Sequence, residues 1–207
     1  DDLRRGVSTN HKVYGEATAT LAGDGLQAAA FEAMYSDMLY YFDDSAALKR
    51  RIRAAYEISK GSGCRGMIAG QIADMEAEHQ QCSSELLEYI HLTKTTALIV
   101  AAVRAGAMLG GADRETLDKL TTYAENLGLG FQVCDDILDV EGDVNALGKQ
   151  TGMDMERGKA TYPSIHGLEA AKAKLEELTN NALAAIEDYY DNAELFAKLA
   201  KDMATRG

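Results

Sequence analysis

The sequence contains no tryptophan, one proline and four phenylalanines among its 207 residues. Because proline interrupts helices more strongly than any other residue, its scarcity permits long helices. The residues that favour strands do not form continuous runs, which argues against a large sheet. The three cysteines, an odd number without the spacing of a metal site, suit a reduced cytoplasmic interior better than a disulfide framework. They are Cys64, Cys82 and Cys134.

Positive charge is also scarce, with 21 lysines and arginines against 33 aspartates and glutamates and a net charge of −12. This balance argues against binding of nucleic acid or an anionic membrane by bulk charge. Phosphate groups would have to be bound by a few local cations or by metal ions. The longest uncharged apolar stretch, residues 95–103, is shorter than the ~20 residues that span a bilayer. We therefore expect no stable membrane insertion.

Helical periodicity and alanine are abundant along most of the chain. The pattern predicts one all-α domain without linkers or repeats. The glycine pair at 23 and 25 predicts a break in the first helix, and Gly61-Ser62-Gly63 predicts the end of the second. Pro163 fits the first turn of a late helix. The predicted helices cover residues 10–39, 46–60, 65–79, 84–109, 113–140 and 163–190, followed by a short last one.

The sharpest chemical feature is an acidic face on the helix predicted over 113–140. Gln132, Asp135, Asp136 and Asp139 fall at positions i, i+3, i+4 and i+7, so they lie on one face. Carboxylates this close repel one another. Mg²⁺ would relieve the repulsion, because it binds one or two carboxylates and takes its other ligands from water and substrate phosphates. Taken alone, a solvated acidic face explains the pattern equally well.

The segment after this helix, residues 141–161, is rich in glycine and charge. The pairs Gly148-Lys149 and Gly158-Lys159 would allow backbone and ammonium groups to approach a phosphate. In isolation, an ordinary surface loop is the simpler interpretation. Next to an acidic metal-binding face, a diphosphate site explains both features together.

Three further positions are candidates for the same site. Lys94 lies on an apolar helical stripe, Asp74 lies on a polar stripe with Gln71 and Glu78, and Arg4-Arg5 is a guanidinium pair suited to phosphate. Each has an ordinary alternative, namely a lysine that extends to solvent or a solvated polar face.

Together these segments resemble the trans-type polyprenyl diphosphate synthases over essentially the whole chain, and in particular the bacterial short-chain members that make farnesyl or geranylgeranyl diphosphate. The resemblance implies an α-helical bundle around a central cavity with two facing aspartate-rich motifs. Asp135, Asp136 and Asp139 match the second motif, and the first motif precedes Leu3 in the family. We therefore expect residues 1–207 to form a single domain, the C-terminal two-thirds of the family domain. The segments that carry the resemblance are residues 1–6, 11–16, 21–24, 70–74, 91–95, 131–139 and 148–163.

The resemblance implies a prenyltransferase that ionises an allylic diphosphate, condenses the cation with isopentenyl diphosphate and eliminates a proton. Mg²⁺ would be the cofactor, and farnesyl diphosphate is the favoured product. By family position, the metal would be served by Asp135 and Asp139, with Asp136 and Asp74 in the surrounding network. The allylic diphosphate would be bound by Arg4, Lys94, Lys149 and Lys159, and isopentenyl diphosphate by Arg5. The oxygens of Thr95 and Gln132 would lie near the developing carbocation.

Two alternatives of other kinds stay open. The chain could be a non-catalytic partner subunit of a heteromeric synthase, or a class I terpene cyclase with the same helical fold. The arginine pair and the Gly-Lys loop favour a prenyltransferase over a cyclase, and the intact second motif argues against a decayed subunit. The family usually forms homodimers, so we expect one here. The residues that set product length in the family precede the first motif, so the sequence does not determine the chain length of the product.

Overall fold

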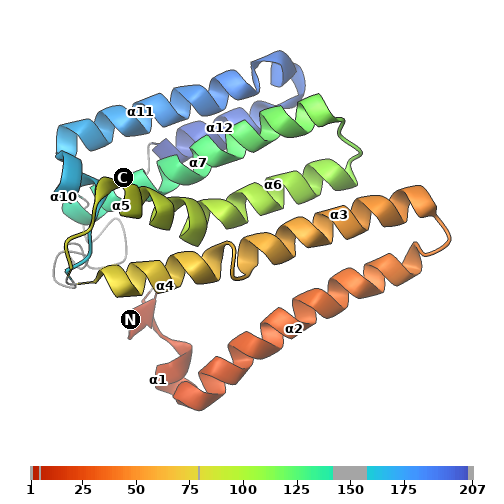
Figure 1. Ribbon diagram of the computed structural model, residues 1–207, viewed down its shortest axis with the longest axis horizontal. Helices are drawn as coiled ribbons and strands as arrows, with labels where there is room; N and C mark the ends of the chain where they lie inside the picture. The colour runs from red at the N-terminus through yellow and green to blue at the C-terminus, as the bar shows by residue number, and fades with distance from the viewer. Residues whose placement is uncertain (1, 5, 79, 142–157, 205–207) are drawn as a thin grey trace.

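The computed structural model describes residues 2–4, 6–78, 80–141 and 158–204. Within these ranges the chain is a bundle of helices, preceded by a hairpin of two two-residue strands, β1 (Leu3–Arg4) and β2 (Val7–Ser8), that pair antiparallel (Figure 1). The prediction of an all-α fold is confirmed. The helices are α1 (Asn10–Tyr14), α2 (Glu16–Tyr40), α3 (Ser45–Ser62), α4 (Met67–Ala77), α5 (Ser84–Ile90), the π-helix η1 (His91–Thr96), α6 (Ala97–Leu109), α7 (Arg114–Glu141), α10 (Tyr162–His166), α11 (Leu168–Ala185), the 3₁₀-helix η2 (Glu187–Asn192) and α12 (Glu194–Ala204).

Two predicted helix boundaries are wrong, and backbone conformation explains both. The first break falls at Gly15, with φ +84°, whereas Gly23 and Gly25 lie inside α2. The predicted helix over 163–190 is divided at Gly167, with φ +86°, and ends in η2. A glycine inside a helix costs only about 1 kcal/mol relative to alanine, which a long helix tolerates. A positive φ reverses the chain direction and ends the helix.

The predicted end of the second helix at Gly61-Ser62-Gly63 is confirmed, because α3 ends at Ser62 and Gly63 is its C-cap. A Cβ at position 61 would lie 2.7 Å from the Cβ of Ala101 and 2.8 Å from the carbonyl oxygen of Ala97. The glycine therefore permits α3 and α6 to pack closely. The start of α10 agrees with the prediction, since Pro163 lies in its first turn and Thr161 forms a capping box with Ser164.

Helix α7 occupies the centre of the bundle, between α6 on one side and α11 and α12 on the other (Figure 1). Its Tyr123 is fully buried, and the hydroxyl donates a hydrogen bond to the carbonyl of Phe196 at 2.8 Å. The guanidinium of Arg104 on α6 donates to Thr121 on α7 at 2.7 Å and to Glu57 on α3 at 3.1 Å. These partly buried hydrogen bonds fix the positions of α3, α6, α7 and α12 relative to one another.

One continuous helical run in the described part of the chain, Ser84–Leu109, is long and apolar enough to cross a membrane by length and composition, with a mean hydropathy of 1.4. The uncharged stretch over residues 95–103 is only part of this run. Its length therefore gave no sign of an apolar helix long enough to cross a membrane. Core helices of globular bundles satisfy the same criterion. In this bundle the run packs against α3, α4 and α7, and it carries Lys94 in an ion pair.

Candidate active site

Three site residues predicted from distant parts of the sequence meet at one point. The ammonium of Lys94 on η1 lies 2.7 Å from the Oδ2 atom of Asp74 on α4, and the ammonium of Lys159 lies 3.1 Å from the same oxygen. All three side chains are largely buried, with exposed fractions of 29% for Lys94, 18% for Lys159 and 13% for Asp74. We call this group the Lys–Asp–Lys cluster. Two cations and one carboxylate leave it with a net positive charge, which suits it to bind an anion.

The two lysines control the ionisation of Asp74. Burial alone would raise the pKa of this carboxyl group, but hydrogen bonds and charge from Lys94 and then Lys159 outweigh burial and hold the pKa below its ordinary value of 3.8. Glu78 lies at the edge, with its Oε1 atom 4.0 Å from the Lys159 ammonium. Asp74 therefore stays ionised at neutral pH, and each ammonium group has donors beyond the one given to Asp74.

A pH dependence of stability follows from the lowered pKa of Asp74. Asp74 should stabilise the folded state above the unfolded pKa of 3.8, and this contribution should disappear as the pH falls through the lower folded pKa. We expect Asp74→Asn to lower the thermal unfolding midpoint near neutral pH, and the difference from wild type to shrink as the pH is brought below 3.8. Thermal unfolding of both proteins across this range measures the difference. A difference that does not depend on pH would contradict the ionised cluster.

Two glycines set the position of η1, which carries Lys94 and Thr95. A Cβ at Gly70 of α4 would overlap the backbone of Lys94 and lie 2.6 Å from the Oγ1 atom of Thr93. A Cβ at Gly128 of α7 would lie 2.8 Å from the Cα atom of Thr96. The π-helix is therefore held between α4 and α7 at backbone contact distance, and π-helical turns often occur at functional sites. The sequence pattern did not predict the π-helix. The signal that the sequence did contain was one glycine inside each of the two helices that contact it, Gly70 and Gly128.

The acidic face of α7 is divided between burial and partial exposure. Asp136 and Asp139 are each 6% exposed, whereas Gln132 and Asp135 are partly exposed. Oδ2 of Asp136 accepts a hydrogen bond from the backbone N–H of Tyr162 at 2.7 Å and lies 3.4 Å from Nε2 of His91. Within residues 2–141 and 158–204, apart from residues 5 and 79, no group of three or more His, Cys, Asp or Glu side chains is placed to hold a metal ion. A metal at this face would need ligands from water or phosphate as well.

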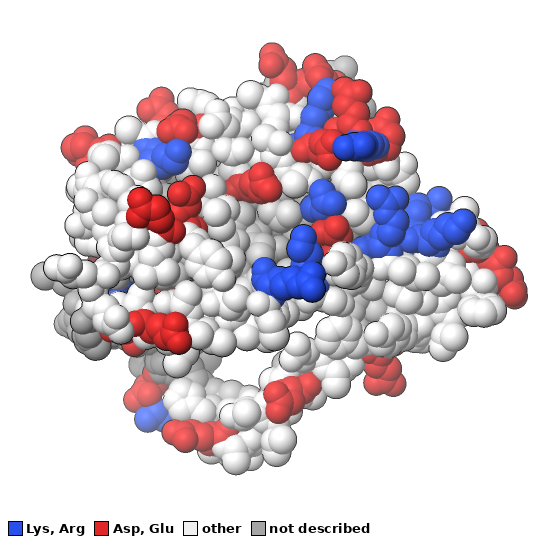
Figure 2. Space-filling model, in the orientation of Figure 1, with Lys and Arg blue, Asp and Glu red and all other residues white. Residues whose placement is uncertain are grey.

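The remaining predicted site residues are less informative. Arg4 lies on β1 and is exposed. Arg5 and Lys149 lie outside the described residues. Figure 2 shows acidic side chains spread over this face of the molecule, with lysines and arginines in a few groups, one of them over α3. Although the net charge is negative, this face therefore carries local groups of positively charged side chains.

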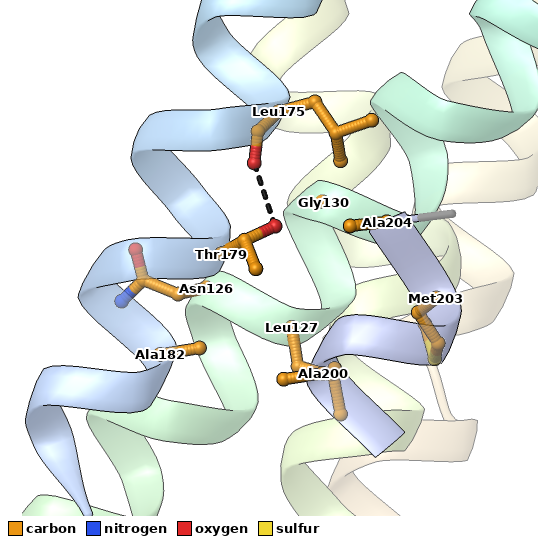
Figure 3. Close-up of a pocket in the computed structure, with 9 residues that line it drawn as sticks. All are labelled: Asn126, Leu127, Gly130, Leu175, Thr179, Ala182, Ala200, Met203 and Ala204. Carbon is orange, nitrogen blue, oxygen red and sulfur yellow. Dashed lines mark hydrogen bonds between the residues drawn. The ribbon is translucent and has the colours of Figure 1, made fainter. Parts of the chain in front are cut away.

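Two cavities of the described structure lie away from the Lys–Asp–Lys cluster. The pocket in Figure 3, between α7, α11 and α12, has a volume of about 10 Å³ and is lined by apolar side chains such as Leu127 and Met203. Since a single water needs about that much space, this pocket is a packing gap. A groove of about 390 Å³ lies where α7 meets α11, and Cys134 and Leu138 line it rather than the aspartates.

The chain has the all-α isoprenoid synthase fold, as similar solved structures show. An FPP/GFPP synthase from Zymomonas mobilis superposes with a TM-score of 0.84 at 32% identity, over 98% of this chain and 66% of that one. A geranyltransferase from Helicobacter pylori, complexed with magnesium and isoprenyl diphosphate, gives a TM-score of 0.81 at 30% identity, over 98% of this chain and 64% of that one.

Sequence comparison identifies the family. The chain belongs to the polyprenyl synthetase family, whose model matches residues 1–199. It is 43% identical to the farnesyl diphosphate synthase of Bacillus subtilis over 206 residues, which are 100% of this chain and 68% of the relative. The chain spans between 50% and 68% of the length of the curated relatives it matches.

Proposed function

We propose that the protein containing this chain is a Mg²⁺-dependent trans-prenyltransferase. It condenses isopentenyl diphosphate with dimethylallyl or geranyl diphosphate, releases pyrophosphate, and forms a short-chain product, with farnesyl diphosphate favoured. The observation that carries this proposal is the meeting of Lys94, Asp74 and Lys159, which forms a partly buried cationic site in a fold shared with prenyl synthases. The names of the relatives, farnesyl diphosphate synthases among them, support the product class.

In this proposal the two lysines bind the allylic diphosphate. The anion would accept hydrogen bonds from the ammonium donors that Asp74 leaves free, and Asp74 would keep both lysines in place. Partial burial strengthens these contacts, because charges interact more strongly where water is excluded. Thr95 follows Lys94 on η1 and would present its hydroxyl oxygen to the developing carbocation, together with the amide oxygen of Gln132. Arg4, Arg5 and Lys149 remain proposed substrate-binding residues.

The acidic face of α7 has the chemistry that Mg²⁺ requires. Asp135 and Asp139 are one helical turn apart and supply hard oxygen donors. Too few side chains are placed to complete a shell among the described residues, which suits a cation that takes its other ligands from phosphate and water. When bound, the ion would neutralise negative charge on the diphosphate leaving group. Asp135 and Asp139 would then orient the diphosphate toward Lys94 and Lys159.

The exposed apolar helix α2 supports the proposed homodimer. None of its 25 residues is buried, and large apolar side chains such as Leu21, Leu26 and Leu39 are more than two-thirds exposed. Figure 1 shows α2 meeting α3 at one end and diverging from the bundle at the other. Large apolar side chains grouped on an exposed surface commonly mark an interaction site. Light scattering should give twice the mass of one full-length chain, and a stable monomer would contradict this proposal.

The test of the proposed activity is a comparison of two proteins. The full-length protein, incubated with Mg²⁺, labelled isopentenyl diphosphate and each allylic primer, should form labelled prenyl diphosphates. A protein beginning at Asp1 should form none, because a clamped diphosphate needs carboxylates on both sides and residues 1–207 carry only the second motif. Elongation by the shorter protein would contradict the two-sided metal site. An inactive full-length protein would favour the partner-subunit alternative. None of the three cysteines, all of which lie in the described part of the chain, forms a disulfide, and we include a cytoplasmic location in the same proposal.

A further inference from the structure

Asp136 of the aspartate motif contacts partners inside the protein. Its side chain is 9% exposed, and its Oδ2 atom accepts the backbone N–H of Tyr162 at 2.7 Å. The Nε2 atom of His91, 6% exposed, lies 3.4 Å from the same oxygen. The Oδ2 atom of Asp136 is therefore engaged with partners inside the protein.

The residue that Asp136 anchors begins the segment next to Lys159. Tyr162 is the first residue of α10 and follows Lys159 by three positions. The Tyr162 ring stacks on His166 with 4.4 Å between the centroids, and Nε2 of His166 shares a hydrogen bond with Ser84 on α5 at 3.0 Å. Helix α10 is thus attached to α7 at its first residue, through Asp136, and to α5 at its last residue, His166.

This attachment fixes the point from which Lys159 reaches the Lys–Asp–Lys cluster. Only Ala160 and Thr161 separate Lys159 from the anchored residue, and Thr161 is 7% exposed and held by its capping box with Ser164. Because only two residues separate the fixed N–H of Tyr162 from Lys159, the backbone of Lys159 has little conformational freedom, and this limits the positions of its ammonium group. If the anchor were lost, the Lys159 ammonium would no longer be held 3.1 Å from Asp74.

We propose that Asp136 is a positioning residue that places Lys159 for diphosphate binding, and that it is not a metal ligand. This inference rests on the proposed prenyltransferase function. It assigns Asp136 to holding the start of α10 and leaves the proposed metal binding to Asp135 and Asp139. Buried polar groups need hydrogen-bond partners, and the backbone N–H of Tyr162 supplies one to the buried carboxyl group of Asp136.

The experiment compares Asp136→Asn, Asp136→Ala and Asp135→Asn in the full-length protein. The amide oxygen of asparagine still accepts the Tyr162 N–H, so Asp136→Asn should lose far less turnover than Asp135→Asn, which removes a charge at the reacting centre and should cost on the order of a hundredfold. Asp136→Ala should raise KM for the allylic diphosphate about tenfold or more, the effect expected for the loss of one hydrogen bond to a charged group, with a smaller change in kcat. If Asp136→Asn loses as much turnover as Asp135→Asn and needs more Mg²⁺, Asp136 is a metal ligand and the proposal is wrong.

Two further measurements separate positioning from a general loss of structure. In a Lys159→Ala background, Asp136→Ala should add little to the rise in KM, since the two changes act through one group; additive effects would overturn the proposal. Hydrogen exchange at the Tyr162 amide should remain slow in wild type and Asp136→Asn and become fast in Asp136→Ala. If the wild-type protein transfers no prenyl group, the proposed function is wrong. The positioning role of Asp136 is tested separately, because slow exchange of the Tyr162 amide in Asp136→Ala would disprove it whether or not the protein is active.

Discussion

Gly70→Ala is expected to lower both the stability and the activity of the protein, although it adds only one methyl group. The added Cβ would overlap the backbone of Lys94 and approach its Cα atom to 2.6 Å. Backbone atoms cannot rotate away, so α4 or η1 must shift. Overpacking of this kind typically costs about 1–3 kcal/mol, and the shift would also separate Lys94 from Asp74. We expect a lower thermal unfolding midpoint and a loss of prenyl transfer in the full-length protein.

Gly106→Ala provides the matched control. Gly106 also lies inside a helix, α6, but a Cβ there meets nothing within 4 Å. Alanine should therefore be neutral or should stabilise the helix by about 0.5–1 kcal/mol. If Gly70→Ala behaves like Gly106→Ala in both assays, α4 and η1 are not in the contact described above.

Lys94→Ala is expected to reduce turnover by roughly a hundredfold or more, the usual cost of removing one preorganised charge at a reacting centre. The Lys94 ammonium is partly buried, 2.7 Å from Asp74, and the proposal places the allylic diphosphate beside it. Folding should change little, because Lys159 still pairs with Asp74. Turnover and thermal unfolding of the full-length variant measure the two effects separately.

The control for Lys94→Ala is Lys198→Ala, which removes an exposed lysine from α12. It changes the net charge by the same amount and should leave turnover unchanged. Near-normal turnover in Lys94→Ala, or an equal loss in both variants, would show that the Lys–Asp–Lys cluster does not bind the substrate.

Local patterns were sufficient for the helices and for part of the site. Scarce proline and a 3.6-residue period predicted the helices, because amphipathic faces and caps are properties of neighbouring residues. The same period placed Gln132, Asp135, Asp136 and Asp139 on one face of α7. It could not distinguish Gly15, which turns the chain, from Gly23 and Gly25, which do not, because a positive φ depends on where the chain must change direction.

The meeting of distant residues was decided only by tertiary structure. Asp74 and Lys94 are 20 positions apart, and Asp74 and Lys159 are 85 positions apart, so no local pattern relates them. Their contact depends on the close approach of α4 to η1 at Gly70 and on the return of the chain to α7 at Tyr162. The separate environment of Asp136 has the same origin. The backbone N–H of Tyr162 is 26 positions from Asp136, and His91 is 45 positions away on another helix.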